Sequence, residues 1–395
     1  MKAVGIIAEY NPFHNGHAYH LQEAKRVTGA DVAVVVMSGN FVQRGEPAIL
    51  DKWERTKLAL HNGADLMVEL PVFDAVQPGH LFAQGAVQIL AALGVHDLVF
   101  GSEHPDVDFM DLAKKAAAIE SEGQFTDRTQ TFASAYAAQL EEKTGFKLED
   151  PNDILAFSYA KAVLASDVEM DLHPIARKQA AYHDQLIDEA QDIASASSIR
   201  LALHKGKWEK VEKVVPADTL KALKEKPTSL GFEKPFFDLL RYRLLTDTVG
   251  QLGQVYQMAE GLEYRLVGVA TAKEAPQSYQ SFIRAVKSKR YTFARMQRTM
   301  LYTLLNIKVD QMQAAMADSY IRLLGFTDEG QAYLSEVKRR ARLPIISRVD
   351  QGLAKANLRL DYKAGLVWQL LAGQAASQEG QDLARRPIHY IKEEN

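Results

Sequence analysis

The sequence predicts a doubly wound α/β domain, built on a parallel sheet, followed by an all-helical basic domain. Strand and helix patterns alternate through the first hundred residues, whereas helix patterns dominate beyond residue 201. The charge divides at the same place. Residues 1–200 hold 16 Lys and Arg against 29 Asp and Glu, and residues 201–395 hold 31 against 21, so the net charges are −13 and +10. We therefore expect an acidic unit for chemistry and a basic unit that binds a polyanion.

Local signals place the elements of the first half. Short runs of small and β-branched residues predict strands at 3–8, 31–37, 66–70 and 97–100. The second of these contains a continuous apolar run, which is typical of a strand buried on both faces. Helix patterns follow at 17–27, 52–61 and 78–93, with Asp51 as the cap of the middle helix. The pattern is then helical from 106 to 164, and an extended run at 170–175 predicts one more strand.

The second half shows helix patterns at 236–245, 254–262, 281–286, 293–305 and 328–340. A Lys-rich segment at 205–227, which contains Pro216 and Pro227, separates the two halves. We therefore predict a catalytic domain over residues 1–205 and a helical domain over residues 206–395.

Composition excludes several classes of protein. The chain of 395 residues has no cysteine, which excludes a disulfide framework, a thiolate metal site and a cysteine nucleophile. No stretch approaches the ~20 apolar residues of a membrane span, and the first residues lack the pattern of a signal peptide. We expect a cytoplasmic protein without a membrane partner, and no protein partner is evident. No metal-ligand spacing such as H-E-x-x-H occurs, so no resident metal is predicted.

The sharpest motif, H-x-G-H, follows the first predicted strand. His14 and His17 lie at i and i+3 across the start of a helix, where free backbone N–H groups and the helix dipole favour a phosphate. Gly16 allows the backbone to approach closely, and the two imidazoles can stabilise charge on a transferring phosphoryl group. The alternative is that both histidines only cap the helix. The position at the carboxyl end of a strand favours a catalytic role, because ligands bind there in α/β sheets.

A second candidate for phosphate binding is the Ser-rich segment at 195–200. Its hydroxyls, its backbone N–H groups and the guanidinium of Arg200 suit a polyphosphate tail at a helix start. Ser195 and Ser197 are the hydroxyls that we expect to face the phosphates. The alternative is an ordinary helix cap.

Taken together, these motifs resemble one known family. H-x-G-H resembles the signature of the nucleotidyltransferase and class I synthetase superfamily, and SASSIR (195–200) resembles that superfamily's second motif, S-S-T-x-I-R, with two substitutions. The whole set resembles the tRNA(Met) cytidine acetate ligase family, and it consists of IIAEYNPFHNGH (6–17), MSGNFVQRGEPA (37–48), LVFGSE (98–103), PNDIL (151–155) and SASSIR (195–200).

The resemblance implies a nucleotidyltransferase-like (Rossmann-like) ATP-binding domain and a helical tRNA-binding domain. Such enzymes are cytoplasmic. They use ATP to activate acetate as acetyl-adenylate, and they then acetylate N4 of the wobble cytidine of elongator tRNA(Met). We expect Mg²⁺ to arrive with the ATP. The resemblance also places catalytic roles on His14 and His17. The ATP-binding positions that it implies are Ile7, Ala8, Glu9, Tyr10, Asn11, Pro12, Phe13, His14, Asn15, Gly16, His17, Ala18, Tyr19, His20, Gly101, Asn152 and Arg177.

Three of these positions have an independent interpretation. Gly101 ends the fourth predicted strand, where a missing side chain lets a nucleoside lie against backbone. Asn152 stands at a helix start and can hydrogen-bond a ribose or a base. Arg177 follows the last predicted strand and can bind a phosphate. The structural alternatives are a strand-end turn, an N-cap and a surface salt bridge.

Other polar residues are weaker candidates for the site. The loop at 38–45 follows the second strand, so Arg44 can neutralise a carboxylate or an RNA phosphate, and Asn40 and Gln43 can contact a base. His173, His183 and Asp184 belong either to the site or to the local fold.

Basic residues gather in the second half, where we expect contacts with tRNA phosphates. On the helix predicted at 293–305, Arg295 and Arg298 are expected to point outward, opposite Phe293 and Met296. The predicted tRNA-binding residues are Arg284, Lys287, Lys289, Arg290, Arg295 and Arg298. A second basic cluster is 338–342, and Tyr291 is expected in the core with Phe293.

Two other functions fit parts of the sequence. A small-molecule adenylyltransferase would use both phosphate motifs but leaves the basic half unexplained. A non-catalytic RNA-binding protein with ATP as a ligand would bind tRNA without turnover. The residues alone do not identify acetate, N4 or the particular tRNA, which rest on the resemblance, and they assign neither an acetate pocket nor a general base.

Overall fold

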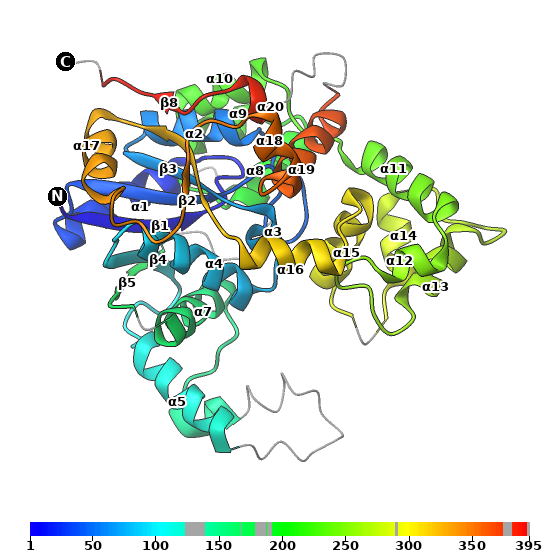
Figure 1. Cartoon of the computed structure of the whole chain (residues 1–395), viewed down its shortest axis with the longest axis horizontal. Helices are drawn as coiled ribbons and strands as arrows, with labels where there is room; N and C mark the ends of the chain where they lie inside the picture. Colours follow the sequence, from blue (N-terminus) through cyan, green and yellow to red (C-terminus); the bar gives the residue numbers. More distant parts are fainter. Residues whose placement is uncertain are drawn as a thin grey trace.

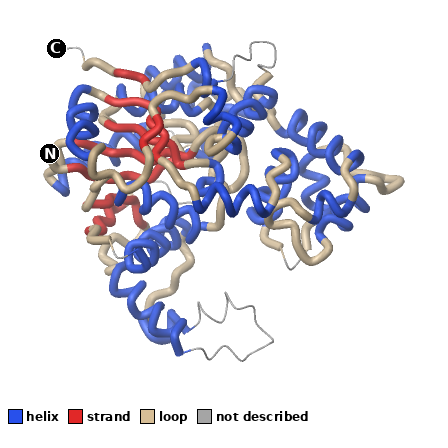
Figure 2. Tube along the Cα trace, in the orientation of Figure 1, coloured by secondary structure: helices blue, strands red, loops and turns tan. Residues whose placement is uncertain are grey.

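The computed structural model describes residues 1–122, 139–166, 168–177, 187, 192–288, 291–373 and 381–392. Within these residues an α/β lobe built around one sheet lies beside a helical lobe, and the strands are confined to the first of them (Figures 1 and 2). The N-terminus and β8, the last strand of the described residues, lie on the side of the α/β lobe that faces away from the helical lobe (Figure 1).

The strands of the sheet are β1 (Ala3–Ala8), β2 (Val32–Ser38), β3 (Leu66–Leu70), β4 (Asp97–Ser102), β5 (Asp171–Ala176), β6 (Ile321–Phe326), β7 (Ile345–Ile346) and β8 (Ile388–His389). Helices of the first half are α1 (Asn15–Thr28), α2 (Lys52–His61), α3 (Val72–Ala75), α4 (Gly79–Ala92), α5 (Phe109–Glu122), α7 (Pro151–Ser166) and α8 (Ala196–His204).

Helices of the second half are α9 (Trp208–Val214), α10 (Ala217–Glu225), α11 (Glu233–Thr246), α12 (Val249–Gly253), α13 (Leu262–Ala270), α14 (Tyr279–Val286), α15 (Phe293–Leu305), α16 (Val309–Ala317), α17 (Asp328–Val337), α18 (Gln351–Lys355), α19 (Arg359–Leu371) and α20 (Gln381–Ala384).

The first five strands form the predicted parallel sheet. Their order is β5-β4-β1-β2-β3, and every pair among them is parallel. After β3 the chain crosses to the other side of β1 to form β4, so the strand order reverses at β1. The crevice at the carboxyl ends of strands beside such a switch point is where open α/β sheets bind ligands.

Both faces of this sheet are covered, as the apolar run in β2 predicts. Val34 and Val36 pack on one face with residues of α4, α5 and α7. Val35 and Met37 pack on the opposite face with residues of α1, α2 and α8. Alternation of side chains along a strand places these neighbours on opposite faces. The sheet is therefore a rigid platform for the loops at its carboxyl edge.

The fold class is confirmed, but the second half is not entirely helical. It contributes β6, which runs antiparallel to β3, and β7 and β8, which pair with β6. The six residues of β6 are almost completely buried, so they cover the open edge of β3. The short IRLLGF run lies between helix patterns, and its pairing partner is more than 250 residues away, so local sequence gave no signal for it.

One predicted helix is absent. The sequence predicts a helix at 254–262, whereas α12 ends at Gly253 and α13 begins at Leu262. Between them Gln257 and Glu260 adopt left-handed backbone angles, with φ of 62° and 57°. The amide of Tyr256 instead donates to the carbonyl of Ile307 at 2.9 Å. A long-range contact therefore replaces the local helix.

A separate apolar core fills the helical lobe. Phe236, Met300 and Trp368 are among its buried residues, and Phe73 of α3 joins it from the α/β lobe. The indole Nε1 of Trp368 donates to the carbonyl of Ala48 at 2.7 Å, which ties α19 to the loop between β2 and α2. The helical lobe is thus packed directly against a loop at the carboxyl edge of the sheet.

Candidate nucleotide-binding site

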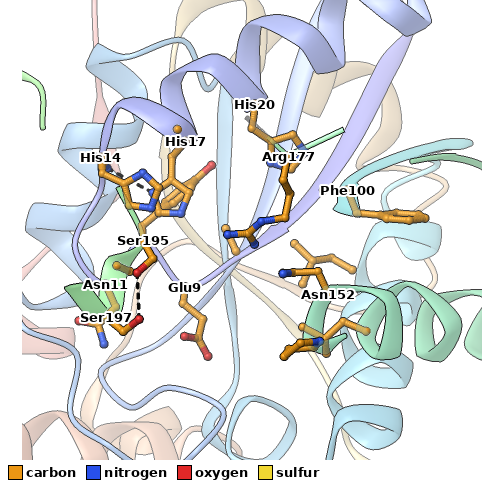
Figure 3. A pocket seen from close by; sticks show the side chains of 18 of the residues that line it. Glu9, Asn11, His14, His17, His20, Phe100, Asn152, Arg177, Ser195 and Ser197 are labelled. Atoms are coloured by element: carbon orange, nitrogen blue, oxygen red, sulfur yellow. Dashed lines mark hydrogen bonds between the residues drawn. The ribbon is translucent and has the colours of Figure 1, made fainter. Parts of the chain in front are cut away.

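A cavity of about 390 Å³ opens at the carboxyl ends of β1, β4 and β5, within the size range of ligand pockets. Its walls come from the end of β1, the start of α1, the β2–α2 loop and the starts of α7 and α8. Figure 3 shows side chains from these elements pointing into one space. The chain thus brings together segments that lie almost 200 residues apart.

Most of the residues predicted to bind ATP line this cavity. They are Ile7, Ala8, Glu9, Tyr10, Asn11, His14, Gly16, His17, Tyr19, His20, Gly101, Asn152, Arg177, Ser195, Ser197 and Arg200. Four residues of the predicted set do not line it, and they are Pro12, Phe13, Asn15 and Ala18. Of these, Phe13 is fully buried and packs against Tyr10 with ring centroids 4.8 Å apart, so it supports the motif from behind.

The two histidines of the motif are stacked. Their ring centroids lie 3.6 Å apart with an interplanar angle of 25°. The backbone amide of His14 donates to Nδ1 of His17 at 3.2 Å, so His17 caps the helix through one nitrogen. Its other nitrogen, Nε2, then carries the proton in the neutral ring and is a donor. Capping and ligand binding are therefore compatible roles of the same side chain.

Burial keeps these imidazoles neutral. Burial, with the charges of Arg177 and Arg200 nearby, lowers the pKa of His14 to about 3. Burial also lowers the pKa of His17 well below its ordinary value and that of His20 to about 4. Each neutral ring still offers one N–H donor. The N–H of His20 is engaged with the backbone of Val99. Nδ1 of His14 and Nε2 of His20 are buried and have no hydrogen-bond partner among the described residues.

Gly16 is required by the position of the His14 ring. A Cβ at Gly16 would lie 2.9 Å from Cε1 and 3.0 Å from Nδ1 of His14, closer than such atoms normally approach. It would also lie 3.3 Å from Cγ2 of Ile193 on the facing loop. The missing side chain of Gly16 thus leaves room for the His14 imidazole, which is a steric reason for a glycine at this position of the motif.

The Ser-rich segment lies beside His14, on the same side of the cavity (Figure 3). Ser195 is the N-cap of α8, and its Oγ accepts from the amide of Ser198 at 3.1 Å. Oγ of Ser197 lies 3.0 Å from Oγ of Ser195. Nη1 of Arg200, one turn along α8, donates to the carbonyl of Asn11 at 2.7 Å. The segment therefore caps its helix and also holds hydroxyls and a cation beside the H-x-G-H motif.

Gly101, Asn152 and Arg177 form the other side of the cavity. A Cβ at Gly101 would lie 3.3 Å from Cγ of Arg177, so the glycine lets the arginine stem cross the strand end. Nδ2 of Asn152 donates to Oε1 of Glu103, and Nε of Arg177 lies 3.9 Å from the same oxygen. The aromatic ring of Phe100 borders this region. This side of the cavity offers apolar and polar groups that suit a nucleoside. The hydroxyls and the cation of the Ser-rich segment, which suit phosphates, lie on the other side.

The start of α7 is fixed by a buried carboxylate. Asp153 is 1% exposed, and its Oδ1 accepts from Oγ of Ser102 at 2.6 Å while Oδ2 is paired with Nδ1 of His104, also at 2.6 Å. Asp150 lies 3.8 Å from the same imidazole. The side chains of His104, Asp150 and Asp153 are spaced like metal ligands. The contacts of the His104 imidazole with both carboxylates explain this spacing without a metal. They position Asn152 at the edge of the cavity.

The comparisons agree with this geometry. The profile of the family described as HIGH Nucleotidyl Transferase matches residues 1–382. The chain is 66% identical over 392 residues to the tRNA(Met) cytidine acetate ligase of Leuconostoc citreum (strain KM20), which covers 99% of this chain and 98% of that protein. The chain belongs to the tRNA(Met) cytidine acetate ligase family of HIGH nucleotidyl transferases.

Further members of the acetate ligase family show the same extent of similarity. The tRNA(Met) cytidine acetate ligase of Oenococcus oeni (strain ATCC BAA-331 / PSU-1) is 50% identical over 98% of this chain and 100% of its own length. Among solved structures, Thermotoga maritima TmcAL bound with alpha-thio ATP superimposes with a TM-score of 0.84 at 30% identity, covering 99% of this chain and 100% of that one. Its apo form gives a TM-score of 0.85.

The structure also shows cavity residues that sequence reasoning assigned weakly or not at all. Gln43 and Arg44 of the β2–α2 loop line the cavity, as proposed for this loop, whereas Asn40 is buried and accepts from the amide of Lys52. Glu46 lines the cavity as well and had no local signal beyond its place in the loop. Two further candidates, His183 and Asp184, lie outside the described residues.

His173 has a structural role. Its Nε2 is 2.8 Å from Oδ1 of Asp97 on the neighbouring strand, and it is not part of the cavity lining. Cross-strand pairing therefore accounts for this histidine.

Arg55 is a positioning residue that the sequence did not reveal. Its guanidinium is completely buried and donates to the carbonyls of Glu9, Ser38 and Gly39, at the carboxyl ends of β1 and β2, while Nε donates to Leu50. Burial lowers the pKa of Arg55 to about 10. One side chain of α2 thus fixes the backbone of both strand ends that border the cavity. Its position between Glu54 and Thr56, in the polar first half of the helix, gave no indication of these partners.

The basic residues of the helical half differ in exposure. Arg284 and Lys287 are exposed at the end of α14, while Arg295 is half-buried over the Tyr291 ring at 4.8 Å. The expected outward position of Arg298 is wrong, since it is only 6% exposed, and a Cβ at Gly45 would lie 3.1 Å from its Cα. Packing of α15 against the β2–α2 loop explains this burial. Lys289 and Arg290 lie outside the described residues.

Two other expectations for this half can be compared with the structure. Tyr291 is buried as expected, but Phe293 is 40% exposed at the first turn of α15 and does not belong to the core. The second basic cluster, at 338–342, is exposed at the end of α17, on the side of the sheet far from α14 and α15 (Figure 1). Among the described helices, none combines the length and hydropathy that a membrane-spanning segment requires.

Proposed function

We propose that this chain is an ATP-dependent ligase that activates acetate as acetyl-adenylate and acetylates N4 of the wobble cytidine of elongator tRNA(Met), releasing AMP and pyrophosphate. One observation carries the proposal. The H-x-G-H motif and the Ser195–Arg200 segment converge on a single cavity in a chain that matches tRNA(Met) cytidine acetate ligases along almost their whole length. The match to Thermotoga maritima TmcAL bound with alpha-thio ATP supports ATP as the nucleotide.

In this proposal an acetate oxygen attacks the α-phosphorus of ATP, and pyrophosphate leaves. His14 and His17 donate hydrogen bonds to the phosphoryl oxygens as negative charge builds on them. Ser195, Ser197 and Arg200 hold the departing pyrophosphate. Gly101, Asn152 and Arg177 hold the nucleoside and its nearer phosphate. Mg²⁺ bound to ATP would neutralise charge on its phosphates.

The second step transfers the acetyl group. The N4 amine attacks the acetyl carbon of the adenylate, the C–N bond forms, the bond to the phosphate oxygen breaks, and AMP leaves with its electron pair. We place tRNA on the basic half, over residues 206–395, whose net charge of +10 favours an RNA backbone. A tRNA substrate also implies a cytoplasmic location.

The test is ATP–pyrophosphate exchange with the purified chain, with and without acetate, first alone and then with bulk tRNA. We expect exchange that requires acetate, because the adenylate forms reversibly. His14→Ala and His17→Ala should each reduce it at least ~100-fold, the range found when a transition-state donor is removed. His96→Ala is the matched control, since His96 is exposed and outside the cavity.

The other outcomes distinguish the alternatives. Exchange without acetate would indicate an adenylyltransferase that acts on another acceptor. ATP and tRNA binding without exchange under either condition would indicate a non-catalytic binding protein. Normal exchange in both histidine variants would overturn the assigned role of the motif.

A further inference from the structure

The acetyl transfer of the proposed function needs a group that accepts a proton. The exocyclic N4 amine of cytidine is conjugated with its ring and is a weak nucleophile, so it must lose a proton as the C–N bond forms. A positioned side chain that takes this proton contributes typically 10²–10⁴-fold to such a step. The identity of the residue that accepts this proton is an inference that rests on the proposed function.

The lining offers few bases. Among its described residues only Glu9 and Glu46 are carboxylates. Glu46 is engaged at both oxygens, since Oε1 accepts from Nε2 of Gln297 at 3.0 Å and Oε2 lies 3.9 Å from Nη2 of Arg200. The histidines of the motif are poor proton acceptors near neutral pH, because the pKa of His14 is about 3. Glu9 remains.

Glu9 is held by one oxygen and free at the other. It is the first residue after β1, at the switch point of the sheet. Its Oε1 accepts from the amide of Gln43 at 2.9 Å, and its carbonyl accepts from Arg55. Within the described residues no donor is bonded to Oε2. Figure 3 shows the carboxylate pointing into the open space between the side of His14, Ser195 and Ser197 and the side of Asn152.

The surroundings of Glu9 make it a stronger base than an exposed carboxylate. Burial raises its pKa, the Gln43 amide opposes this rise, and of the nearby charges Glu46 raises the pKa while Arg200 and Arg44 lower it. The negative charge of Glu9 also acts on two neighbours, Tyr159 of α7 and Arg55 of α2, and tends to raise the pKa of each. A general base works best when its pKa approaches the working pH, so the direction of this shift suits proton transfer.

Glu9 is also held by the loop that packs against the helical lobe, on which we place tRNA. The β2–α2 loop lines the cavity through Gln43, and its other surface packs against α15 of the helical lobe through Gly45 and Glu46. The amide that fixes Glu9 therefore belongs to the segment between the two lobes. A base held there would meet a cytidine that enters between the phosphate site and the helical lobe.

We propose that Glu9 is the general base of the acetyl-transfer step. As the N4 nitrogen attacks the acetyl carbon, the N4 proton passes to Oε2 of Glu9. The C–N bond forms, the bond between the acetyl carbon and the phosphate oxygen breaks, and AMP leaves with that electron pair. Glu9 returns the proton to water after the products depart. The adenylation step has no proton to transfer and does not use this carboxylate as a base.

The test separates the two steps with Glu9→Gln, which keeps an oxygen for the Gln43 amide but cannot take up a proton. Glu9 lines the ATP cavity but takes no proton in adenylation. We therefore expect acetate-dependent ATP–pyrophosphate exchange, measured at saturating ATP, to fall by a much smaller factor than acetyl transfer. In single turnover with saturating tRNA, acetylation should fall ~10²–10³-fold. The wild-type transfer rate should rise with pH through the pKa of Glu9, because only the ionised form accepts a proton, and this rising limb should vanish in the variant.

Glu46→Gln is the matched control, and we expect it to keep the rising limb. Equal losses of exchange and transfer in Glu9→Gln would overturn the proposal, because Glu9 would then act in binding ATP or acetate. Wild-type transfer by Glu9→Gln would overturn it in favour of another acceptor. Absence of acetate-dependent exchange in the wild type would instead overturn the proposed function, and this role with it.

Discussion

The start of α1 shows how one residue determines the geometry of its neighbours. Gly16 leaves room for the His14 ring, His14 stacks on His17, and the His17 ring packs edge-on against Tyr10 with centroids 4.8 Å apart. Tyr10 is buried and holds a left-handed backbone angle, φ 48°. The motif therefore acts as one packed unit, and a change in its smallest member should alter the chemistry more than the stability.

Gly16→Ala tests this at the residue scale. The new methyl group would push the His14 ring from its place, so we expect exchange to fall ~10–100-fold, as small misplacements of catalytic groups do. The free energy of unfolding should change by no more than about 1 kcal/mol, because a ring at the cavity edge can move. Gly268→Ala on α13, where a Cβ meets nothing within 4 Å, is the control and should leave exchange unchanged.

The buried imidazole also predicts how stability depends on pH. His14 has a folded pKa of about 3 against an ordinary value of 6.5, so below 6.5 the unfolded chain binds a proton that the folded chain does not. Its contribution is present above pH 6.5 and is lost as the pH falls toward 3. Because of His14 alone, the free energy of unfolding should be about 2 kcal/mol lower at pH 5 than at pH 7.

The measurement is urea unfolding of the wild type and of His14→Asn at both pH values, since the variant cannot titrate there. The stability of His14→Asn should fall by about 2 kcal/mol less than that of the wild type. Identical losses in the two proteins would show that His14 is not held neutral by the fold.

At the scale of elements, a buried set of charges joins segments from both halves of the chain. Lys52 of α2 is 1% exposed, and its Nζ lies 2.7 Å from Oε2 of Glu69 on β3 and 2.7 Å from Oδ1 of Asp382 on α20. Arg322 of β6 lies 3.8 Å from the same Asp382 oxygen. Asp361 of α19 accepts from the amide of Val72 at 2.7 Å. These contacts fasten the last third of the chain to the sheet.

Lys52→Met should therefore destabilise the protein strongly. Removing one partner of a buried ion pair leaves uncompensated charge, which costs about 3–5 kcal/mol. Lys57→Met on the exposed face of the same helix is the matched control and should change the unfolding free energy by less than about 0.5 kcal/mol. Both can be measured by urea unfolding at pH 7. A small effect of Lys52→Met would mean that the carboxylates take up protons at little cost.

At the scale of the whole molecule, the two basic clusters lie on opposite sides. Arg284 and Lys287 are on the helical lobe, which adjoins the β2–α2 loop of the cavity. Lys338 and Arg339 follow α17, which packs against β2, β3 and β6 on the side away from α14 and α15 (Figure 1). A tRNA that delivers its cytidine to the cavity can contact the first cluster more readily. The two pairs allow a comparison in which the change of net charge is the same.

We expect Arg284→Glu with Lys287→Glu to weaken tRNA binding at least ~10-fold and to reduce its dependence on salt, because fewer counterions are released. Exchange with acetate should be unaffected, since both residues lie outside the cavity. Lys338→Glu with Arg339→Glu should have the smaller effect on tRNA affinity, measured by filter binding over a range of salt concentrations. The reverse order of the two effects would place the RNA on the α17 side.

Local sequence determined the first sheet and the motifs. Short-range signals were sufficient for these elements. The apolar run of β2 indicated a strand buried on both faces, and the Asp51 cap, which accepts from Glu54 at 2.8 Å, marked the start of α2. The predicted bounds of α2 and β3 are those of the structure. The H-x-G-H and Ser-rich motifs identified the cavity because each stands at a strand end or helix start, where backbone groups alone favour a ligand. Nearness along the chain was sufficient for these features.

Only the tertiary structure decided the rest, because the deciding contacts join residues far apart in sequence. The pairing of β6 with β3, the burial of Arg298 against Gly45 and the clamp of Arg55 on two strand ends have no local signature. The sequence placed Glu9 in a motif without assigning its role as a base. The fold brings the Gln43 amide to one of its oxygens and leaves the other facing the cavity. Sequence specified which groups could act, and packing between distant segments specified where each one acts.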